Sequence, residues 1–297
     1  MNLLGRKKIW YLAISGIIIL TGIISLLIFK LRLGIDFVGG SIIEIETKQN
    51  TNFSNDKIKQ ALADKNIENL SIYQIGEGGW VLKMKEIDEN KKNEIINAIK
   101  NKVGESEERR FETVGPTVSQ NLRQKSIFAI ILAMFAIIFY IALAFRRLPK
   151  FLSPWKFGIS AIIALVHDLL IVLGAFSILS HFWGYEIDSM FITALLTILG
   201  FSVHDTIVVF DRIRENFHSN SPYSGLDIES VANYSLVQTM GRSLNTSLTI
   251  ILVLIVMLTL GGNTIQPFIV AMLIGMITGT YSSIFIATPI LVFWHRK

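Results

Sequence analysis

Ser189–Phe210 reads SMFITALLTILGFSVHDTIVVF, an apolar run that only His204 and Asp205 interrupt. The hydrocarbon core of a bilayer requires about 20 mainly apolar residues in one helix, and this run supplies them. Ionisable side chains at bilayer depth are costly and by default indicate a functional site. The run therefore predicts a membrane-spanning helix that carries chemistry.

Further segments of the chain are equally long and apolar. They are Ile9–Phe29, Ser126–Phe145, Phe157–Ser180, Ser243–Gly262 and Phe268–Trp294. Of the 297 residues, 51% are apolar and 17% are charged, whereas soluble domains carry about a quarter charged residues. Mean hydropathy is +0.51. With no cysteine in addition, the chain is neither an ordinary soluble enzyme nor a disulfide scaffold. We predict an α-helical polytopic membrane protein with six transmembrane helices.

Basic residues predict the orientation of the spans. Lys and Arg gather in segments that share one side of the membrane. They are Arg6, Lys7 and Lys8; Arg146, Arg147, Lys150 and Lys156; Arg212, Arg214 and Arg242; and Arg296 and Lys297. The short connections on the other side, His181–Asp188 and Asn263–Pro267, contain neither Lys nor Arg. The positive-inside rule then places both termini in the cytoplasm and residues 30–125 outside, in the periplasm or at the cell surface.

Residues 30–125 predict a separate α+β domain, while residues 1–29 and 126–297 form the membrane part. Strands are predicted over Gly40–Thr47, Asn69–Ile75, Trp80–Lys85 and Glu107–Val114, helices over Asn55–Lys65 and Asp88–Val103, and a hairpin turn over Gly76–Gly79. The order β-α-β-β-α-β is typical of a ferredoxin-like fold. Because that fold serves many functions, we interpret the segment as a solvated interaction domain.

Two His-Asp dipeptides lie inside predicted spans, at His167-Asp168 and His204-Asp205. Asp168 lies about 15 Å along its span, near the membrane centre, and Asp205 lies nearer the cytoplasmic side unless its helix continues through Ile213. The span that starts at Ser243 is preceded by Arg242, which could face Asp205. A near cation lowers a carboxyl pKa and desolvation raises it, as a proton relay requires. We predict a relay at Asp205 and Arg242, with His204, Asp168 and His167 as further candidates.

The alternative interpretation is that these polar groups only join helices to one another. Interhelical polar contacts average about 0.6 kcal/mol, which is modest, and they are common. Relay and helix-packing roles both stay open for His204 and His167, and Asp168 either belongs to the ion path or fixes the geometry of its span. Gly275 and Gly279 form a GxxxG motif in the last span, which predicts close helix packing.

Hydrolytic chemistry has no support in the sequence. The chain contains no Walker A sequence and no HExxH or GxSxG motif. The outer segment contains no cluster of metal ligands and no set of residues for nucleophilic catalysis. We therefore expect a protein that is not an enzyme and that requires no metal, no cofactor and no nucleic acid.

Several short motifs carry a family resemblance over almost the whole chain. They are GIDFVGG at Gly34–Gly40 (with Asp36, Phe37, Gly39 and Gly40), VGPTV at Val114–Val118 (with Gly115 and Pro116), His167-Asp168, Glu186–Asp188, DTIVVFDRIREN at Asp205–Asn216 (with Asp211, Arg212, Arg214 and Glu215), Gln238-Thr239 and Arg242-Ser243. On these motifs the sequence resembles the SecF branch of the SecD/SecF family, within the resistance-nodulation-division (RND) superfamily. One departure is His204, where that branch commonly has Asn.

The resemblance implies a subunit of the Sec protein translocase in the bacterial cytoplasmic (inner) membrane. Together with SecD, such a subunit uses the proton motive force, or a sodium gradient, to drive late steps of protein translocation. The implied partners are SecD, the SecYEG translocon and the exported unfolded polypeptide, with YajC and YidC as further partners and a functional link to SecA. The family's proton-path residues fall on Asp205 and Arg242.

Two other classes of protein share some of these features. A subunit of an RND small-molecule exporter would carry larger outer domains than residues 30–125 provide. A passive scaffold of the translocon would not need titratable groups in its spans. The coupling ion, proton or sodium, does not follow from an Asp and an Arg alone.

Overall fold

The structure of the chain, a computed structural model, describes residues 4–5, 7–47, 54–76, 78–146, 153–217 and 226–295. The sequence predictions for Arg6, Glu77, Arg147, Lys150, Arg296 and Lys297 lie outside these residues, as does the side chain of Lys7. The chain divides into two compact units, one of Met1–Arg32 with Ile127–Lys297 and one of Leu33–Ser126.

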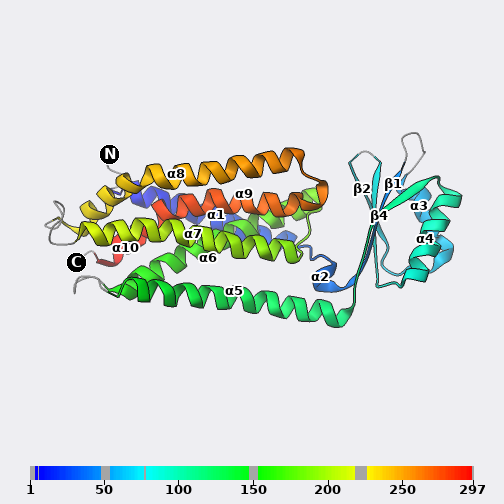
Figure 1. Cartoon of the computed structure of the whole chain (residues 1–297), viewed down its shortest axis with the longest axis horizontal. Helices are drawn as coiled ribbons and strands as arrows, with labels where there is room; N and C mark the ends of the chain where they lie inside the picture. The colour runs from blue at the N-terminus through cyan, green and yellow to red at the C-terminus, as the bar shows by residue number, and fades with distance from the viewer. Residues whose placement is uncertain are drawn as a thin grey trace. The chain divides into compact units, whose positions relative to one another are not determined.

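The first unit is helical, and six helices of the described chain are long and apolar enough to cross a membrane (Figure 1). They are α1 (Lys7–Phe29), α5 (Pro116–Ala144), α6 (Pro154–Trp183), α7 (Ser189–Asn216), α8 (Ile228–Leu260) and a composite last helix. The last helix joins α9 (Gln266–Ser282), the π-helical turn η3 (Ser283–Ala287) and α10 (Thr288–His295), after a short 3-10 turn at Asn263–Ile265. Each predicted span coincides with one of these helices, which confirms the helical membrane architecture.

Two helices begin well before their apolar runs. The α5 helix begins at Pro116, a residue favoured in the first helical turn because it has no N–H to satisfy. The α8 helix begins at Ile228, after Asp227, whose carboxylate accepts a hydrogen bond from the Ser230 N–H at 3.3 Å. Hydrogen bonds from Ser230, chiefly from its side chain, lower the pKa of Asp227. Hydropathy marks only the apolar part of a helix, so the polar extensions were not predicted.

The helices α6, α7 and α9 form the centre of the membrane unit. Buried residues make up 50% of the most apolar segment of α6 and of α7 and 61% of that of the last helix, against 6% for α5. The α1 helix crosses α6 closely, since a Cβ at Gly174 would lie 2.5 Å from the Cα of Gly22. Large apolar side chains on α1, α5 and α8 remain exposed, as expected of surfaces that face lipid or a partner.

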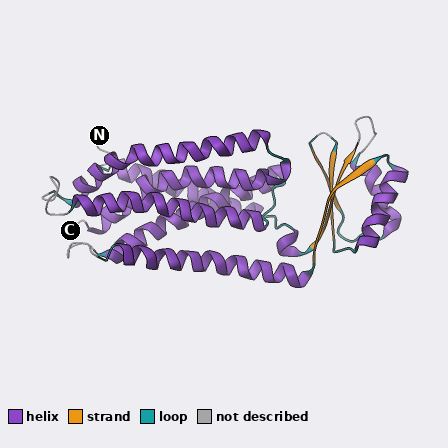
Figure 2. Ribbon diagram, viewed as in Figure 1, coloured by secondary structure: helices purple, strands orange, loops and turns teal. Residues whose placement is uncertain are grey.

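The second unit holds one antiparallel sheet of four strands (Figure 2). The strands are β1 (Gly40–Thr47), β2 (Ser71–Ile75), β3 (Gly79–Met84) and β4 (Ser106–Val114), and they lie in the order β2-β3-β1-β4. The helices are α2 (Ile35–Val38), α3 (Asn55–Leu62) with a 3-10 turn at Ala63–Lys65, and α4 (Glu89–Lys102). Figure 1 shows α3 and α4 on the same face of the sheet.

Alternation along the strands explains which face the helices cover. On β1, Ile43 and Ile45 are fully buried, and they pair with Leu82 and Trp80 of β3. These residues form one core with apolar side chains of the two helices. The helix residues of this core are Ile58 and Leu62 of α3 and Ile95, Ile96, Ala98 and Ile99 of α4. The strand and helix periodicities predicted from sequence therefore meet in a single apolar layer.

Two of the sequence motifs, Gly34–Gly40 and Val114–Val118, meet at one end of the sheet. Gly40 pairs with Val114 at the start of β1 and the end of β4. Gly39 and Gly40 have φ of 79° and 126°, values that side-chain-bearing residues rarely adopt. A Cβ at Gly40 would also lie 2.6 Å from the Met84 carbonyl oxygen. The paired glycines are thus required by the backbone at this junction.

The core predicts a large effect for truncation of Ile99. This side chain on α4 is fully buried, and its replacement by Ala leaves a cavity that costs about 2–5 kcal/mol. We expect Ile99→Ala to raise hydrogen exchange of the β1 and β3 amides in the intact chain. Asn97→Ala, at an exposed position of the same helix, serves as the control and should change exchange little. Equal exchange in both variants would contradict this assignment of the core.

Candidate functional site

Asp168 lies fully buried on α6, where several side chains contact its carboxylate. Ser202 of α7 and Ser282 of α9 donate hydrogen bonds to Oδ2 over 2.6 and 2.7 Å. His167 Nδ1 lies 3.0 Å from Oδ1. A buried carboxylate is costly unless it is paired and hydrogen-bonded, so these contacts account for its presence at the centre of the bundle.

Asp205 lies on α7, where it is 5% exposed. The Ser283 hydroxyl donates a hydrogen bond to Asp205 Oδ2 over 2.7 Å. Ser202 and Asp205 are three residues apart and therefore share one face of α7. Since Ser282 and Ser283 are consecutive, both carboxylates bind the same turn of the last helix. We call Asp168, Asp205, Ser202, Ser282 and Ser283 the carboxylate cluster.

Two glycines allow the last helix to approach α7 at the carboxylate cluster. A Cβ at Gly275 would lie 2.3 Å from Ile198 Cδ1, and a Cβ at Gly279 would lie 3.1 Å from Ser202 Cβ. Residues four apart lie on one helix face, so both glycines face α7. The packing role predicted for the GxxxG motif is confirmed, and it brings Ser282 within reach of Asp168.

A π-helical turn at Ser283–Ala287 interrupts the last helix at the carboxylate cluster. The Thr288 hydroxyl donates to the Ser283 carbonyl oxygen over 3.1 Å and satisfies an acceptor there. Single π-turns inside α-helices occur frequently at functional sites. The sequence treats Phe268–Trp294 as one uninterrupted apolar segment, and no feature of it predicted this turn.

His167 extends the carboxylate cluster towards α1. Its Nε2 atom is buried without a hydrogen-bond partner among the described residues. Its ring stacks on Tyr281, with 6.2 Å between ring centroids. The Tyr281 hydroxyl donates to the Tyr11 carbonyl oxygen of α1 over 3.1 Å, and Ser15 donates to Tyr281. The imidazole thus stands between Asp168 and a hydroxyl network that reaches α1.

Arg242 and His204 lie apart from the carboxylate cluster. Both side chains are exposed, on α8 and α7 respectively. Within the described ranges, the structure contains no hydrogen bond or ion pair between Asp205 and Arg242, which the sequence offered as a residue that could face Asp205. Arg242 instead lines a cavity of about 300 Å³ that opens at the surface between α7 and α8. The other lining residues are Val208, Asp211, Arg212, Glu215, Gln238 and Thr239.

The charged run at the end of α7 forms local ion pairs. Arg212 Nη1 lies 2.6 Å from Glu215 Oε2, and Arg214 Nη2 lies 2.5 Å from Asp211 Oδ1. Arg212 also donates to the Gln238 side-chain oxygen of α8 over 2.6 Å. Arg214 lies over the Phe145 ring, 5.6 Å from its centroid. These contacts tie the cytoplasm-facing end predicted for α7 to α5 and α8.

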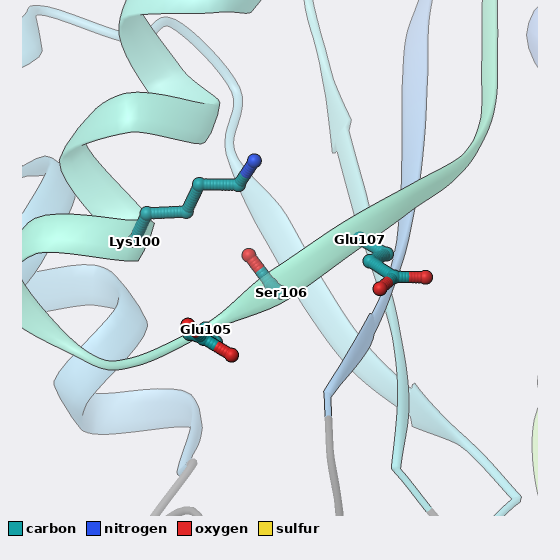
Figure 3. Close-up of a pocket in the computed structure, with 4 residues that line it drawn as sticks. All are labelled: Lys100, Glu105, Ser106 and Glu107. Atoms are coloured by element: carbon teal, nitrogen blue, oxygen red, sulfur yellow. The ribbon is translucent and has the colours of Figure 1, made fainter.

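The second unit has a separate polar cavity of about 390 Å³, lined by Lys100, Glu105, Ser106 and Glu107 (Figure 3). Ser106 is buried, and its hydroxyl has no partner among the described residues. Lys100 lies near the end of α4, Glu105 directly precedes β4, and Ser106 and Glu107 are the first residues of β4. The set contains one cation and two carboxyl groups, and it does not form a nucleophile with a base.

The fold and the carboxylate cluster define a polytopic α-helical membrane protein with ionisable groups buried between its spans and one attached α+β unit. The model of a family described as "Protein export membrane protein SecD/SecF, C-terminal" matches residues 94–297. The model of the "SecD/SecF GG Motif" matches residues 24–51, which include Gly39 and Gly40. The chain belongs to the SecD/SecF family of protein-export membrane proteins.

Named relatives agree with this family over almost the full chain. A "Protein translocase subunit SecF" from Thermobaculum terrenum is 43% identical over 98% of this chain and 93% of its own length. The one from Anaerolinea thermophila is 37% identical over 99% and 94%. A "Protein translocase subunit SecDF" from Bacillus subtilis is 33% identical over 98% of this chain but only 38% of its own length.

A solved structure shows the same fold. The crystal structure of SecDF from Thermus thermophilus, described as a translocon-associated membrane protein, aligns with a TM-score of 0.82 and 29% identity. The alignment covers 99% of this chain and 38% of the SecDF chain. A second SecDF structure, described as a super-membrane-facing form, aligns with a TM-score of 0.67. The present chain therefore spans about two fifths of the length of these SecDF proteins.

Proposed function

We propose that this chain is the SecF-like subunit of a Sec protein translocase and that it couples an ion gradient to a late step of protein export. The observation that carries the proposal is the carboxylate cluster, because buried carboxylates in spans are costly and are retained where ions or protons move. Such a subunit is a coupled transport component and performs no hydrolysis. From the membership in this protein-export family we infer that the cargo is an exported unfolded polypeptide.

In this proposal, SecD binds beside this chain in the membrane. SecYEG is the export channel that the two subunits assist. Exposed polar side chains on two spans, His204 and Arg242, support a partner, since such groups at membrane depth need a protein surface or water. Only 6% of the most apolar segment of the α5 helix is buried, so most of this helix surface can contact lipid or a partner protein. YajC, YidC and SecA belong to the same proposal through the family resemblance alone.

The proposed orientation places both termini in the cytoplasm and the second unit outside, in the inner membrane of a bacterium. Within the second unit we assign a ferredoxin-like fold, supported by the element order β1-α3-β2-β3-α4-β4 and the strand order β2-β3-β1-β4. The chain has no cysteine, so a single introduced cysteine reports its own side of the membrane. Asn97→Cys should react with an impermeant thiol reagent in intact spheroplasts, and Leu226→Cys only after permeabilisation. The reverse pattern would refute the orientation.

Gradient-dependent export tests the proposed function directly. Inner-membrane vesicles containing this chain and its partners should export a model precursor faster with an ion gradient than after an ionophore collapses it. Vesicles lacking the chain should show the slower rate in both conditions. SecD and SecYEG should co-purify with the chain from native membrane. If small-molecule efflux depended on the chain and precursor export did not, the exporter alternative would replace this proposal.

His204 should be dispensable for gradient-dependent export. Its side chain is exposed on α7 and contacts no member of the carboxylate cluster in the described structure. We expect His204→Asn to change the gradient-dependent export rate by no more than about twofold, the effect of a typical surface substitution. Loss of export in this variant, with normal co-purification of SecD, would give His204 a role of its own in the relay.

A further inference from the structure

We infer that Ser282 and Ser283 couple the protonation of Asp168 to that of Asp205, so that protonation of one carboxyl group favours ionisation of the other. The inference rests on the proposed function for its purpose, because a coupled pair is useful where ions move. Its physical content, a dependence of one titration on the other, is independent of the cargo.

The two serines give each carboxylate its own donor on one helical turn. Ser282 contacts Asp168 and Ser283 contacts Asp205, each over 2.7 Å. Neither hydroxyl is held by its carboxylate alone. Ser282 Oγ also lies 3.2 Å from the Gly279 carbonyl oxygen, and Ser283 Oγ lies 3.0 Å from that of Thr280. Each hydroxyl therefore has two acceptors within reach and a single hydrogen to donate.

This arrangement gives each serine two states. Beside an ionised carboxylate, the hydroxyl donates to the carboxylate. Beside a protonated carboxyl group, the carboxyl O–H donates to the serine oxygen and the serine hydroxyl turns to the carbonyl three residues back. The serine thus follows the charge of the carboxyl group without a change of rotamer or of backbone.

Two negative charges beside adjacent residues repel each other strongly in a low-dielectric interior. Protonation of Asp168 should therefore favour ionisation of Asp205, and the reverse should hold. Interacting groups of this kind titrate as a pair and not as separate sites. The π-turn begins at Ser283, so the carbonyl acceptors, the hydroxyls and both carboxyl groups converge where the regular helix is interrupted.

Each helix packed around the carboxylate cluster carries other titratable or charged groups. They are His167 on α6, Tyr11 on α1, Tyr281 on α9, His204 and Asp211 on α7, and Arg242 on α8. His167 contacts Asp168 directly, and the rest touch neither carboxylate within the described residues. A test must therefore separate the serines from His167.

Infrared pH titration of the purified assembly in bilayers can separate the effect of the two serines from that of His167. The carboxyl band of Asp205 is identified by its loss in Asp205→Asn. We expect Ser283→Ala to raise the Asp205 midpoint by about one pH unit, because the ionised form loses its donor. We expect Ser282→Ala to lower the same midpoint. The Ser282 hydroxyl contacts Asp168 and not Asp205, so its loss keeps Asp168 protonated and removes repulsion from Asp205.

The opposite signs distinguish coupling from a general disturbance. Ser160→Ala removes a buried hydroxyl of α6 that has no partner in the described chain, and it should leave the midpoint unchanged. Ser282→Thr keeps the hydroxyl and should resemble the wild type. If Ser282→Ala does not assemble, the isosteric pair Ser282→Val and Ser282→Thr makes the same comparison.

Two results would overturn the inference: an Asp205 midpoint that Ser282→Ala leaves unchanged, or a shift of the same sign in both serine variants. The pH profile of gradient-dependent export should shift with the infrared midpoint. Failure of the proposed function looks different, because Asp205→Asn would then export at the wild-type gradient-dependent rate whatever the midpoints show.

Discussion

Asp205→Asn should remove the whole gradient-dependent component of protein export while the chain still assembles with SecD. Asn keeps the size of the Asp205 side chain and an oxygen that can accept the Ser283 hydrogen bond, so the bundle should stay intact. It cannot bind or release a proton. Export should therefore fall to the rate measured after the gradient is collapsed, and no ionophore should lower it further.

Arg242→Met should also remove the gradient-dependent component of protein export, although Arg242 lies outside the carboxylate cluster. Arg242 lies exposed on α8, in the cavity that also holds Asp211 and Glu215. A guanidinium group on a membrane helix needs a carboxylate, a carbonyl or water as its partner, and the proposed SecD subunit would be one source of such a group. Met has a similar stem without the charge, so the variant removes the electrostatic term and leaves most of the packing.

Two matched controls separate loss of coupling from loss of charge in general. Asp64→Asn removes an exposed carboxylate of the second unit, and Arg123→Met removes an exposed guanidinium of α5. Both should export at the wild-type gradient-dependent rate. Vesicles carrying each variant should contain equal amounts of co-purified SecD. If Asp205→Asn or Arg242→Met retained the wild-type response to the gradient, that residue would not belong to the relay.

The membrane fold could be predicted because the bilayer imposes one simple requirement. Every spanning segment needs about 20 apolar residues, so Ile9–Phe29 and Ser189–Phe210 were recognisable by length alone. The strands of the second unit followed from strict alternation, as at Ile43 and Ile45 in β1. Both signals are local in sequence, and both survive in the structure.

The site was less predictable because it depends on contacts between distant segments. The sequence singled out Asp168 and Asp205 as ionisable groups inside spans, and both are buried in the structure. It offered Arg242 as a residue that could face Asp205 and did not indicate the contact with Ser283. Ser282 and Ser283 were not among the predicted site residues, because hydroxyl groups in spans are too common to mark a site. The relay roles of Asp205, Arg242, Asp168, His167 and His204 stay predictions that the variants above test.

Gly275→Leu should strongly impair assembly of the membrane unit, because it overpacks the contact between α9 and α7. The Cβ of any new side chain would lie 2.3 Å from Ile198 Cδ1 and 2.4 Å from Cγ1. Ile198 is fully buried and branched at Cβ, so it cannot turn aside. Overpacking of this kind typically costs about 1–3 kcal/mol for a few methylene groups.

The clash should be relieved from the other side of the same interface. Ile198→Ala removes the atoms that a larger residue at Gly275 would meet, so the double variant Gly275→Leu with Ile198→Ala should accumulate better in the membrane than Gly275→Leu alone. Gly16→Leu makes the same change on α1 where no atom lies within 4 Å, and it should be tolerated.

The measurement is the amount of detergent-extracted chain that stays monodisperse on heating. Equal losses at Gly16 and Gly275 would show that the added bulk destabilises the chain wherever it is placed, and that the approach of α9 to α7 does not decide the outcome. Separation of these helices would also withdraw Ser282 from Asp168, so the partly rescued variant should regain membrane abundance before it regains gradient-dependent export.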